Sequence, residues 1–184
     1  MRKVVAQLFY SVDGVVEAPN KWAAWPDAET GEEMNAVIGG QDDVLLGRVT
    51  YQEWAGYWPT ATDEPFATFI NNVRKHVVSK TLRVVEWKNS RLLGPDTVAA
   101  VQKLKDSSGR DIGVHGSIRL VRSLMRDDLV DELVLLVTPT VAGSGLRRLF
   151  DGADPPRSLK LVRSRVAPNG IATLRYALAT GRAA

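Results

Sequence analysis

The sequence predicts a single α/β domain with a mostly parallel mixed central sheet flanked by helices and an antiparallel C-terminal hairpin. β-Prone apolar runs alternate with helical patterns through residues 4–137, which is typical of parallel βαβ units. Two β-prone segments, 158–166 and 171–179, then follow each other across the turn signal Ala167-Pro168-Asn169-Gly170. The length of 184 residues fits one domain. We assign residues 1–180 to this domain and 181–184 to a tail.

The first half of the chain predicts three strands and three helices. Residues 4–10 form a mostly apolar run, which is typical of a strand buried on both faces. Thr30-Gly31-Glu32-Glu33 has the spacing of a capping box, so we expect a helix to begin there and to end near Gly39. The remaining expected elements are a strand over 42–46, a helix over 48–54, a helix over 65–71 and a strand over 75–79.

The second half continues the alternation. Residues 83–93 predict one or two short strands. Pro95-Asp96 precedes a helix with an apolar face formed by Val98, Val101 and Leu104. The expected elements that follow are a strand over 111–115, a helix over 118–125 and a strongly β-prone strand over 130–137.

The composition excludes several classes of function. The absence of cysteine rules out a disulfide scaffold, a Cys-ligated metal site and a thiol nucleophile. The two histidines, His76 and His115, do not make a metal site by themselves, so we expect none. No apolar run approaches the ~20 residues that span a membrane, and the N-terminal run lacks the features of a signal peptide. We therefore expect a cytoplasmic protein with no membrane partner.

The charge is mildly basic. The formal net charge is +3, but the basic residues are spread along the chain rather than gathered in one stretch. Such a distribution favours small anionic ligands over nucleic acid.

Two strand-to-helix junctions are candidate anion sites. They are Leu46-Gly47-Arg48-Val49-Thr50 and His115-Gly116-Ser117-Ile118. In a parallel sheet such turns lie at the carboxyl ends of strands, where ligands bind. Glycine allows close approach to the backbone, the first N–H groups of the helix are free, and Arg48 could donate a forked guanidinium to a phosphate. The alternative is that each glycine only makes a tight turn and that Arg48 is solvated, since neither junction matches GxGxxG or a P-loop.

The order of four motifs resembles a known family. The motifs are SVDGVV, LLGRVTYQEW, HVVSKT and GVHGSIRLVRSLMRDDLVDELVLLVTPTVAGSGLRRLF. Together they resemble the dihydrofolate-reductase-like superfamily, and most closely the RibD C-terminal domain family, the reductase domain of bacterial riboflavin biosynthesis. The resemblance covers roughly residues 3–178. It implies a dihydrofolate-reductase-like fold, NADPH as hydride donor, a small heterocyclic (pterin- or pyrimidine-like) or carbonyl substrate, and a homodimer formed through the final strands.

The resemblance also implies a cofactor site. Its expected residues are Phe9 and Val16 at the nicotinamide, Gly47, Arg48 and Thr50 at the phosphates, Ser79 and Lys80 at the adenosine, and Gly116, Ser117 and Ile118 at the pyrophosphate. Within this set, Arg48 is the expected partner of the adenosine 2′-phosphate.

The substrate side is implied by fewer residues. Ser11-Val12-Asp13-Gly14 fits the S-x-D-G signature of the riboflavin-type reductases, which makes Asp13 a catalytic candidate; the alternative is an Asp-Gly turn. Glu33 is a second catalytic candidate, near the start of the first helix, with helix capping as the alternative. The expected substrate contacts are Ser11, Trp22, Trp25 and Tyr51. Trp54, Tyr57 and Trp58 could also stack on a flat ring. Core packing is the alternative for the aromatic side chains.

Two rival functions stay open. One is a true dihydrofolate reductase, and the other is a non-catalytic NADP(H)-binding protein on the same fold. The sequence also contains no H-x-E…C-x-x-C signature of the zinc deaminase often fused to riboflavin-type reductases. The substrate and the pathway are therefore open.

Overall fold

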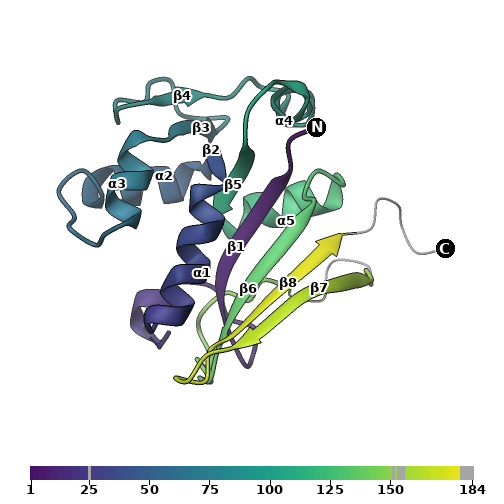
Figure 1. Ribbon diagram of the computed structural model, residues 1–184. Helices are drawn as coiled ribbons and strands as arrows, with labels where there is room; N and C mark the ends of the chain where they lie inside the picture. The colour runs from purple at the N-terminus through teal and green to yellow at the C-terminus, as the bar shows by residue number, and fades with distance from the viewer. Residues whose placement is uncertain (25, 151, 153–155, 179–184) are drawn as a thin grey trace.

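The structure is a computed structural model that describes residues 1–24, 26–150, 152 and 156–178. Within this part of the chain, one mixed sheet of 8 strands has the order β4-β3-β2-β5-β1-β6-β8-β7 (Figure 1). The strands are β1 (Val4–Ser11), β2 (Gln41–Gly47), β3 (Arg74–Val78), β4 (Ser90–Leu92), β5 (Asp111–His115), β6 (Glu132–Thr138), β7 (Leu159–Val166) and β8 (Ala172–Leu178). The helices are α1 (Ala28–Gly39), α2 (Arg48–Tyr57), α3 (Phe66–Asn72), α4 (Thr97–Asp106) and α5 (Ile118–Arg126), with a 3₁₀ turn at Pro19–Lys21.

The strand pairing confirms the predicted fold class. Strands β1 to β6 pair in parallel with one another, whereas β8 pairs antiparallel with both β6 and β7. The predicted hairpin joins β7 to β8, and its turn contains Gly170 with a positive φ of 82°. The parallel strands therefore end at a common edge, and the polar turns that follow them lie together.

Each face of the sheet has its own apolar core. On the face covered by α4 and α5, alternate residues of β1 (Val4, Ala6 and Leu8) pack against those helices. On the other face, side chains of β2 and β3 pack against α2, α3 and Trp87. This alternation follows from the two-residue period of a strand, which sends successive side chains to opposite faces.

Helix α1 begins earlier than the sequence predicted. Its first residue is Ala28, and its N-cap is Asp27, whose carboxylate accepts a hydrogen bond from the backbone N–H of Thr30 at 2.9 Å. Glu33 therefore has no capping role. The capping-box interpretation was wrong because Asp27 supplies the acceptor before the predicted box begins.

The other helices and strands lie close to their predicted positions. Helix α2 extends to Tyr57, three residues past the expected end at 54, and the segment 83–93 contains a single strand, β4.

Across the ranges that the structure describes, no helix combines the length and the hydropathy that a membrane crossing requires.

Candidate functional site

The two predicted junctions meet at the carboxyl edge of the sheet. The Oγ of Ser117, which precedes α5, accepts a hydrogen bond from the backbone N–H of Gly47 at 2.8 Å. The same hydroxyl donates to the Oγ1 of Thr50 at 2.7 Å. A Cβ added to Gly47 would lie 3.1 Å from Ser117 Oγ and 3.3 Å from its Cβ. The glycine is therefore needed for the close approach of the two turns.

The turn before α5 has an unusual backbone. Gly116 and Ser117 are both in the left-handed region, with φ values of 80° and 63°. For serine this conformation costs roughly 1–2 kcal/mol, and such strain is concentrated at functional sites. Ser117 makes no side-chain cap to α5, and Gly47 makes none to α2. The first-turn N–H groups of both helices are thus available for an anion.

Arg48 stands at the first position of α2. It is exposed, and its Nη1 donates to the Oε1 of Gln52 at 2.9 Å, one turn along the helix. This is a weak surface contact of a kind worth a few tenths of a kcal/mol in isolated helices (roughly 0.2–0.5), so the guanidinium can turn toward a phosphate at the N-terminus of α2.

The end of β3 adjoins the same edge. Val78 pairs in register with Gly47, so Ser79 and Lys80 follow directly beside the first junction. The Oγ of Ser79 accepts hydrogen bonds from the backbone N–H groups of Thr81 at 3.1 Å and Leu82 at 2.9 Å. Its hydroxyl thus closes a turn, and the exposed Lys80 is the more available of the two for a ligand.

The two residues expected at the nicotinamide lie in different surroundings. Phe9 is half-buried on β1 and belongs to neither apolar core. Val16 is 6% exposed and packs into the core on the α5 side. The half-buried Ile118 also packs against that core. Of these side chains, Phe9 offers the most surface to a ring.

Asp13 anchors a loop. Its carboxylate accepts hydrogen bonds from Ser11 Oγ at 2.7 Å and from the backbone N–H groups of Ala142 at 2.9 Å and Gly143 at 3.0 Å. The bond from Ser11, followed by that from Ala142, lowers the pKa of Asp13 to about 2. Ser11 is fully buried, and its Oγ also accepts from the backbone N–H of Val15. This geometry argues against the catalytic role expected for Asp13 and against Ser11 as a substrate contact.

Two more predicted residues are engaged in structural contacts. Glu33 accepts a hydrogen bond from Arg163 Nη2 at 3.0 Å, which ties α1 to β7. Tyr51 is buried, and its Oη accepts from the backbone N–H groups of Glu86 at 2.9 Å and Trp87 at 3.1 Å. The geometry therefore argues against Glu33 as an acid at the site and against Tyr51 as a substrate contact.

The predicted aromatic residues differ in their surroundings. Trp22 is half-buried, and its Nε1 donates to the backbone carbonyl of Glu17 at 2.7 Å. Trp25 lies outside the residues that the structure describes. Trp54 packs edge-on against Phe66 with ring centroids 5.7 Å apart, so core packing accounts for it.

Sequence reasoning missed a line of buried polar side chains across β1, β5 and β2. Gln7 pairs in register with His115, and His115 Nε2 lies 2.7 Å from Gln41 Oε1. Burial lowers the pKa of His115 to about 4, so the imidazole is neutral at physiological pH. A lone glutamine inside the apolar run of residues 4–9 was the signal that could have revealed this line.

Both amides of this line have hydrogen-bonding groups that the described residues leave unused. Gln7 is 7% exposed, and its side chain makes no hydrogen bond to any residue that the structure describes. Gln41 Nε2 is buried and equally unpaired within those ranges. The ring of Phe66 borders His115 at 5.6 Å. Buried polar groups are nearly always satisfied, so the unpaired Nε2 of Gln41 indicates where a polar ligand could bind.

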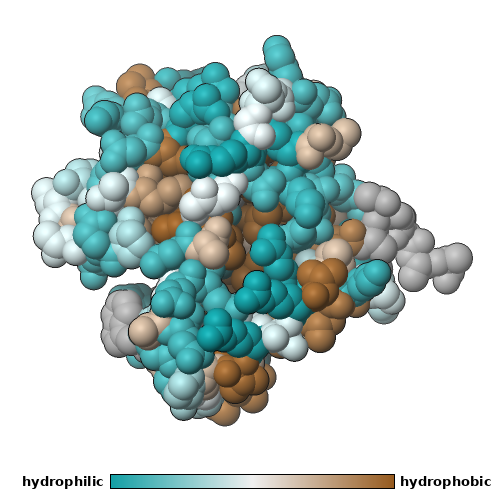
Figure 2. Space-filling model, in the orientation of Figure 1, coloured by the Kyte–Doolittle hydropathy of each residue, from teal (hydrophilic) through white to brown (hydrophobic). Residues whose placement is uncertain are grey.

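The surface of the molecule is recessed in this region. Figure 2 shows apolar atoms set back behind hydrophilic ones near the middle of the view, where Figure 1 draws β1 beside α1. In the described part of the chain, no group of three or more His, Asp or Glu side chains could hold a metal ion.

The chain belongs to the RibD C-terminal domain family, whose model matches residues 2–173. This confirms the resemblance seen in the sequence motifs. Among curated proteins, the uncharacterized protein YyaP of Bacillus subtilis is 26% identical over 183 residues, which cover 95% of this chain and 94% of that protein.

Solved structures share the fold. A "Putative riboflavin biosynthesis protein" from Shewanella sp. PV-4 matches with a TM-score of 0.75 and 19% identity, covering 97% of this chain and 99% of that one. A diaminohydroxyphosphoribosylaminopyrimidine deaminase/5-amino-6-(5-phosphoribosylamino)uracil reductase from Thermotoga maritima matches with a TM-score of 0.68 and 15% identity. That match covers 97% of this chain and 57% of the Thermotoga chain.

Proposed function

We propose that this protein is an NADPH-dependent reductase that transfers a hydride to a small heterocyclic, pterin- or pyrimidine-like substrate or to a carbonyl compound. Membership of the RibD C-terminal domain family supports a reductase-type oxidoreductase. The observation that carries the proposal is the bridge from Ser117 to Gly47 and Thr50, which holds two anion-suited helix N-termini side by side.

The residues at this edge fit a dinucleotide phosphate. The N-termini of α2 and α5 would hold its phosphates, and the left-handed backbone at Gly116 and Ser117 is of the kind that forms anion-binding nests of N–H groups. Arg48 would form a forked pair with the 2′-phosphate. Bound in this way, NADPH would supply the hydride, while the protein would supply binding and orientation.

In this proposal, the buried polar side chains of Gln7 and His115 supply the substrate contacts. Gln7 can both donate and accept a hydrogen bond, and His115 is held neutral beside it. Phe9, two residues further along β1, lies on the same face and would pack against the reacting rings. Because Asp13 and Glu33 are already engaged, solvent would deliver the proton that completes the reduction.

A titration of the purified protein with NADPH and, separately, with NADH tests the proposal through quenching of tryptophan fluorescence. We expect micromolar binding of NADPH, much poorer binding of NADH, and a loss of roughly tenfold or more for NADPH in Arg48→Ala. Arg157→Ala is the matched control, because Arg157 pairs with Asp128 at 2.7 Å, past the C-terminal end of α5. Absence of saturable binding for both cofactors would overturn the proposal.

The engagement of both predicted carboxylates favours a second candidate, a non-catalytic NADP(H)-binding protein on this fold. Such a protein would bind NADPH as tightly but would oxidise none of it in a screen of pterins, pyrimidines and carbonyl compounds. A true dihydrofolate reductase is less well supported, because Glu33 is paired with Arg163; tight methotrexate binding would restore it.

A homodimer through the final strands is part of the proposal. Strand β7 lies at the edge of the sheet, and its Leu161, Val162 and Val166 are 50%, 49% and 70% exposed. Exposed apolar side chains on an edge strand are suited to contact with another chain. Light scattering coupled to size exclusion should give twice the monomer mass, and Val162→Lys should shift the protein toward monomer.

A further inference from the structure

A second cavity lies at the opposite end of the sheet from the junctions, near the amino ends of the parallel strands. Its volume is about 490 Å³, within the roughly 300–1,000 Å³ of small-molecule sites. It lies between β2, β3 and β4 on one side and α4 with the residues that follow it on the other. Its polar lining is Arg2, Asp43, Arg74, Arg91, Lys103, Ser107 and Ser108, and its apolar lining includes Leu92, Leu93, Ala100 and Leu104.

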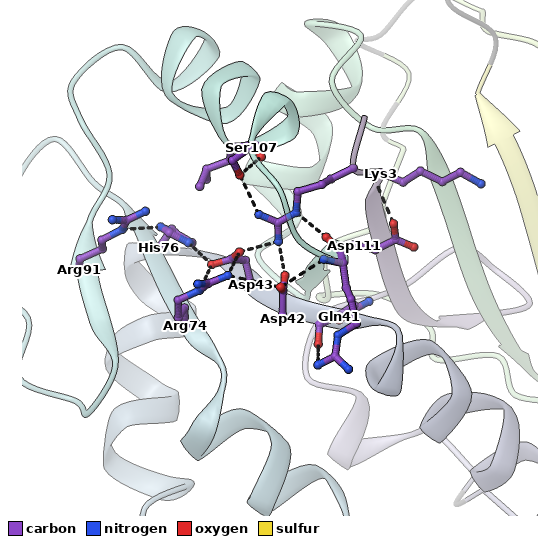
Figure 3. A network of polar contacts seen from close by, with 12 residues as sticks. Lys3, Gln41, Asp42, Asp43, Arg74, His76, Arg91, Ser107 and Asp111 are labelled. Atoms are coloured by element: carbon purple, nitrogen blue, oxygen red, sulfur yellow. Dashed lines mark hydrogen bonds and ion pairs between the residues drawn. The ribbon is translucent and has the colours of Figure 1, made fainter.

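The floor of the cavity is a buried ion-pair network (Figure 3). Asp43 is 1% exposed and accepts hydrogen bonds from Arg74 Nε at 2.9 Å and Arg74 Nη2 at 2.8 Å. The buried Arg2 also donates to Asp43 and to Ser107. Burial alone would raise the pKa of Asp43, but the bonds from His76, Arg74 and Arg2 outweigh it and hold that pKa well below its usual range. Asp43, the only carboxylate among the described residues of the lining, is therefore ionised, and both of its oxygens accept hydrogen bonds within the network.

A buried histidine positions the arginine at the mouth. His76 is fully buried, with Nε2 2.6 Å from Asp43 Oδ1 and Nδ1 2.9 Å from Arg91 Nε. Because an arginine N–H can only donate, Nδ1 must accept, and the imidazole proton lies on Nε2. The chain Asp43–His76–Arg91 thus fixes the guanidinium of Arg91 through its Nε alone.

Two cations of the lining are uncommitted. Within the described residues, the Nη1 and Nη2 of Arg91 have no partner, and Lys103 makes no hydrogen bond or ion pair. The lining carries Arg2, Arg74, Arg91 and Lys103 against the single carboxylate of Asp43. The neighbouring Asp42 pairs with Arg2 and Arg74 and leaves both mouth cations free. The cavity is therefore net positive, with its spare donors at the opening.

We propose that this cavity is a second ligand site, which takes a small phosphate-bearing molecule with a compact apolar body. Arg91 offers two parallel donors in the fork that matches a phosphate, and Lys103 adds a point charge from α4. The wall of Leu92, Leu93 and Ala100 suits the body of the ligand. Because His76 holds Arg91 in place before binding, less conformational freedom is lost on association.

Calorimetric titration with inorganic phosphate at constant ionic strength tests the site. Saturating NADP⁺ is included so that phosphate does not occupy the Gly47 and Ser117 turns. We expect saturable binding that weakens by roughly tenfold in Lys103→Glu. Lys21→Glu in the 3₁₀ turn is the matched control, because Lys21 is exposed, lies outside the cavity lining and gives the identical change of net charge.

A second variant removes the other donor. Arg91→Gln should also weaken phosphate binding by roughly tenfold, and its far-UV circular dichroism shows whether the loss of the His76 contact disturbs the fold. Lys103→Glu breaks no contact of the buried network and remains decisive if Arg91→Gln unfolds. The proposal is overturned if phosphate gives no saturable binding in the millimolar range. It is equally overturned if Lys103→Glu and Lys21→Glu weaken binding to the same extent, since general charge would then explain the affinity.

Discussion

The contact between the two junctions can be tested by adding a single methyl group. The backbone of Gly47 has φ −75° and ψ 159°, a conformation that alanine adopts without strain. The cost of Gly47→Ala therefore comes from its surroundings, because the new Cβ would lie 3.1 Å from Ser117 Oγ. Ser117 must then shift and weaken its bonds to the N–H of residue 47 and to Thr50. Overpacking typically costs about 1–3 kcal/mol, and we expect the free energy of unfolding to fall by that amount.

A double-mutant cycle isolates this contact. In a Ser117→Gly background the colliding atoms are gone, so adding Gly47→Ala should cost less than about 0.5 kcal/mol. Urea unfolding of the wild type, both single variants and the double variant gives the coupling energy, which we expect to reach about 1 kcal/mol or more. If Gly47→Ala costs the same in both backgrounds, the account of the glycine as the room for Ser117 is refuted.

Three other predictions concern polar groups. Gln7→Leu should raise the free energy of unfolding of the ligand-free protein by about 1 kcal/mol, since it places an apolar side chain at a position that is only 7% exposed and breaks no hydrogen bond to a described residue; a loss of stability in urea would contradict this. Lys75→Met should lower stability by about 1–3 kcal/mol, because the Nζ of Lys75 donates to the carbonyls of Ile70 at 2.8 Å and Val73 at 3.0 Å; unchanged thermal unfolding would count against it. Because the pKa of Asp13 is lowered to about 2, its contribution should be full above its unfolded-state pKa of ~3.9 and disappear as the pH falls through about 2. The difference in urea midpoint between wild type and Asp13→Asn should therefore hold at pH 5 and shrink toward pH 2, and a constant difference would exclude this cause.

Local sequence signals were sufficient for most of the fold. The apolar run at 4–10, the Asp96 cap of α4 and the Asn169-Gly170 turn each act over a few residues. Local signals also led to the wrong start for α1. Asp27 and Thr30 are both suitable N-cap residues, and only the folded backbone selects between them.

The candidate site was harder to predict because it depends on partners that are distant in the chain. The carboxylate of Asp13 binds the backbone of Ala142 and Gly143, 129 and 130 residues away. Glu33 likewise finds Arg163 at a separation of 130 residues. The motif positions of Asp13 and Glu33 suggested a catalytic role, whereas their contacts indicate that they stabilise the fold. No pattern near residue 13 or 33 could report those contacts.

The polar residues of this molecule fall into two kinds: those whose hydrogen-bonding groups are all used within the fold, and those that keep unused donors. Ser11, Asp13 and Tyr51 use their side-chain oxygens within the fold, so binding a ligand through them would break native contacts. Gln7 and Arg91 retain donors that the fold does not use, one at the polar line beside His115 and one at the mouth of the second cavity. Neither set of donors is tied up in native contacts, and the exposed guanidinium of Arg91 is hydrated until a ligand replaces the water. Donors that the fold holds in place but does not use are therefore where the ligands of this chain should be sought.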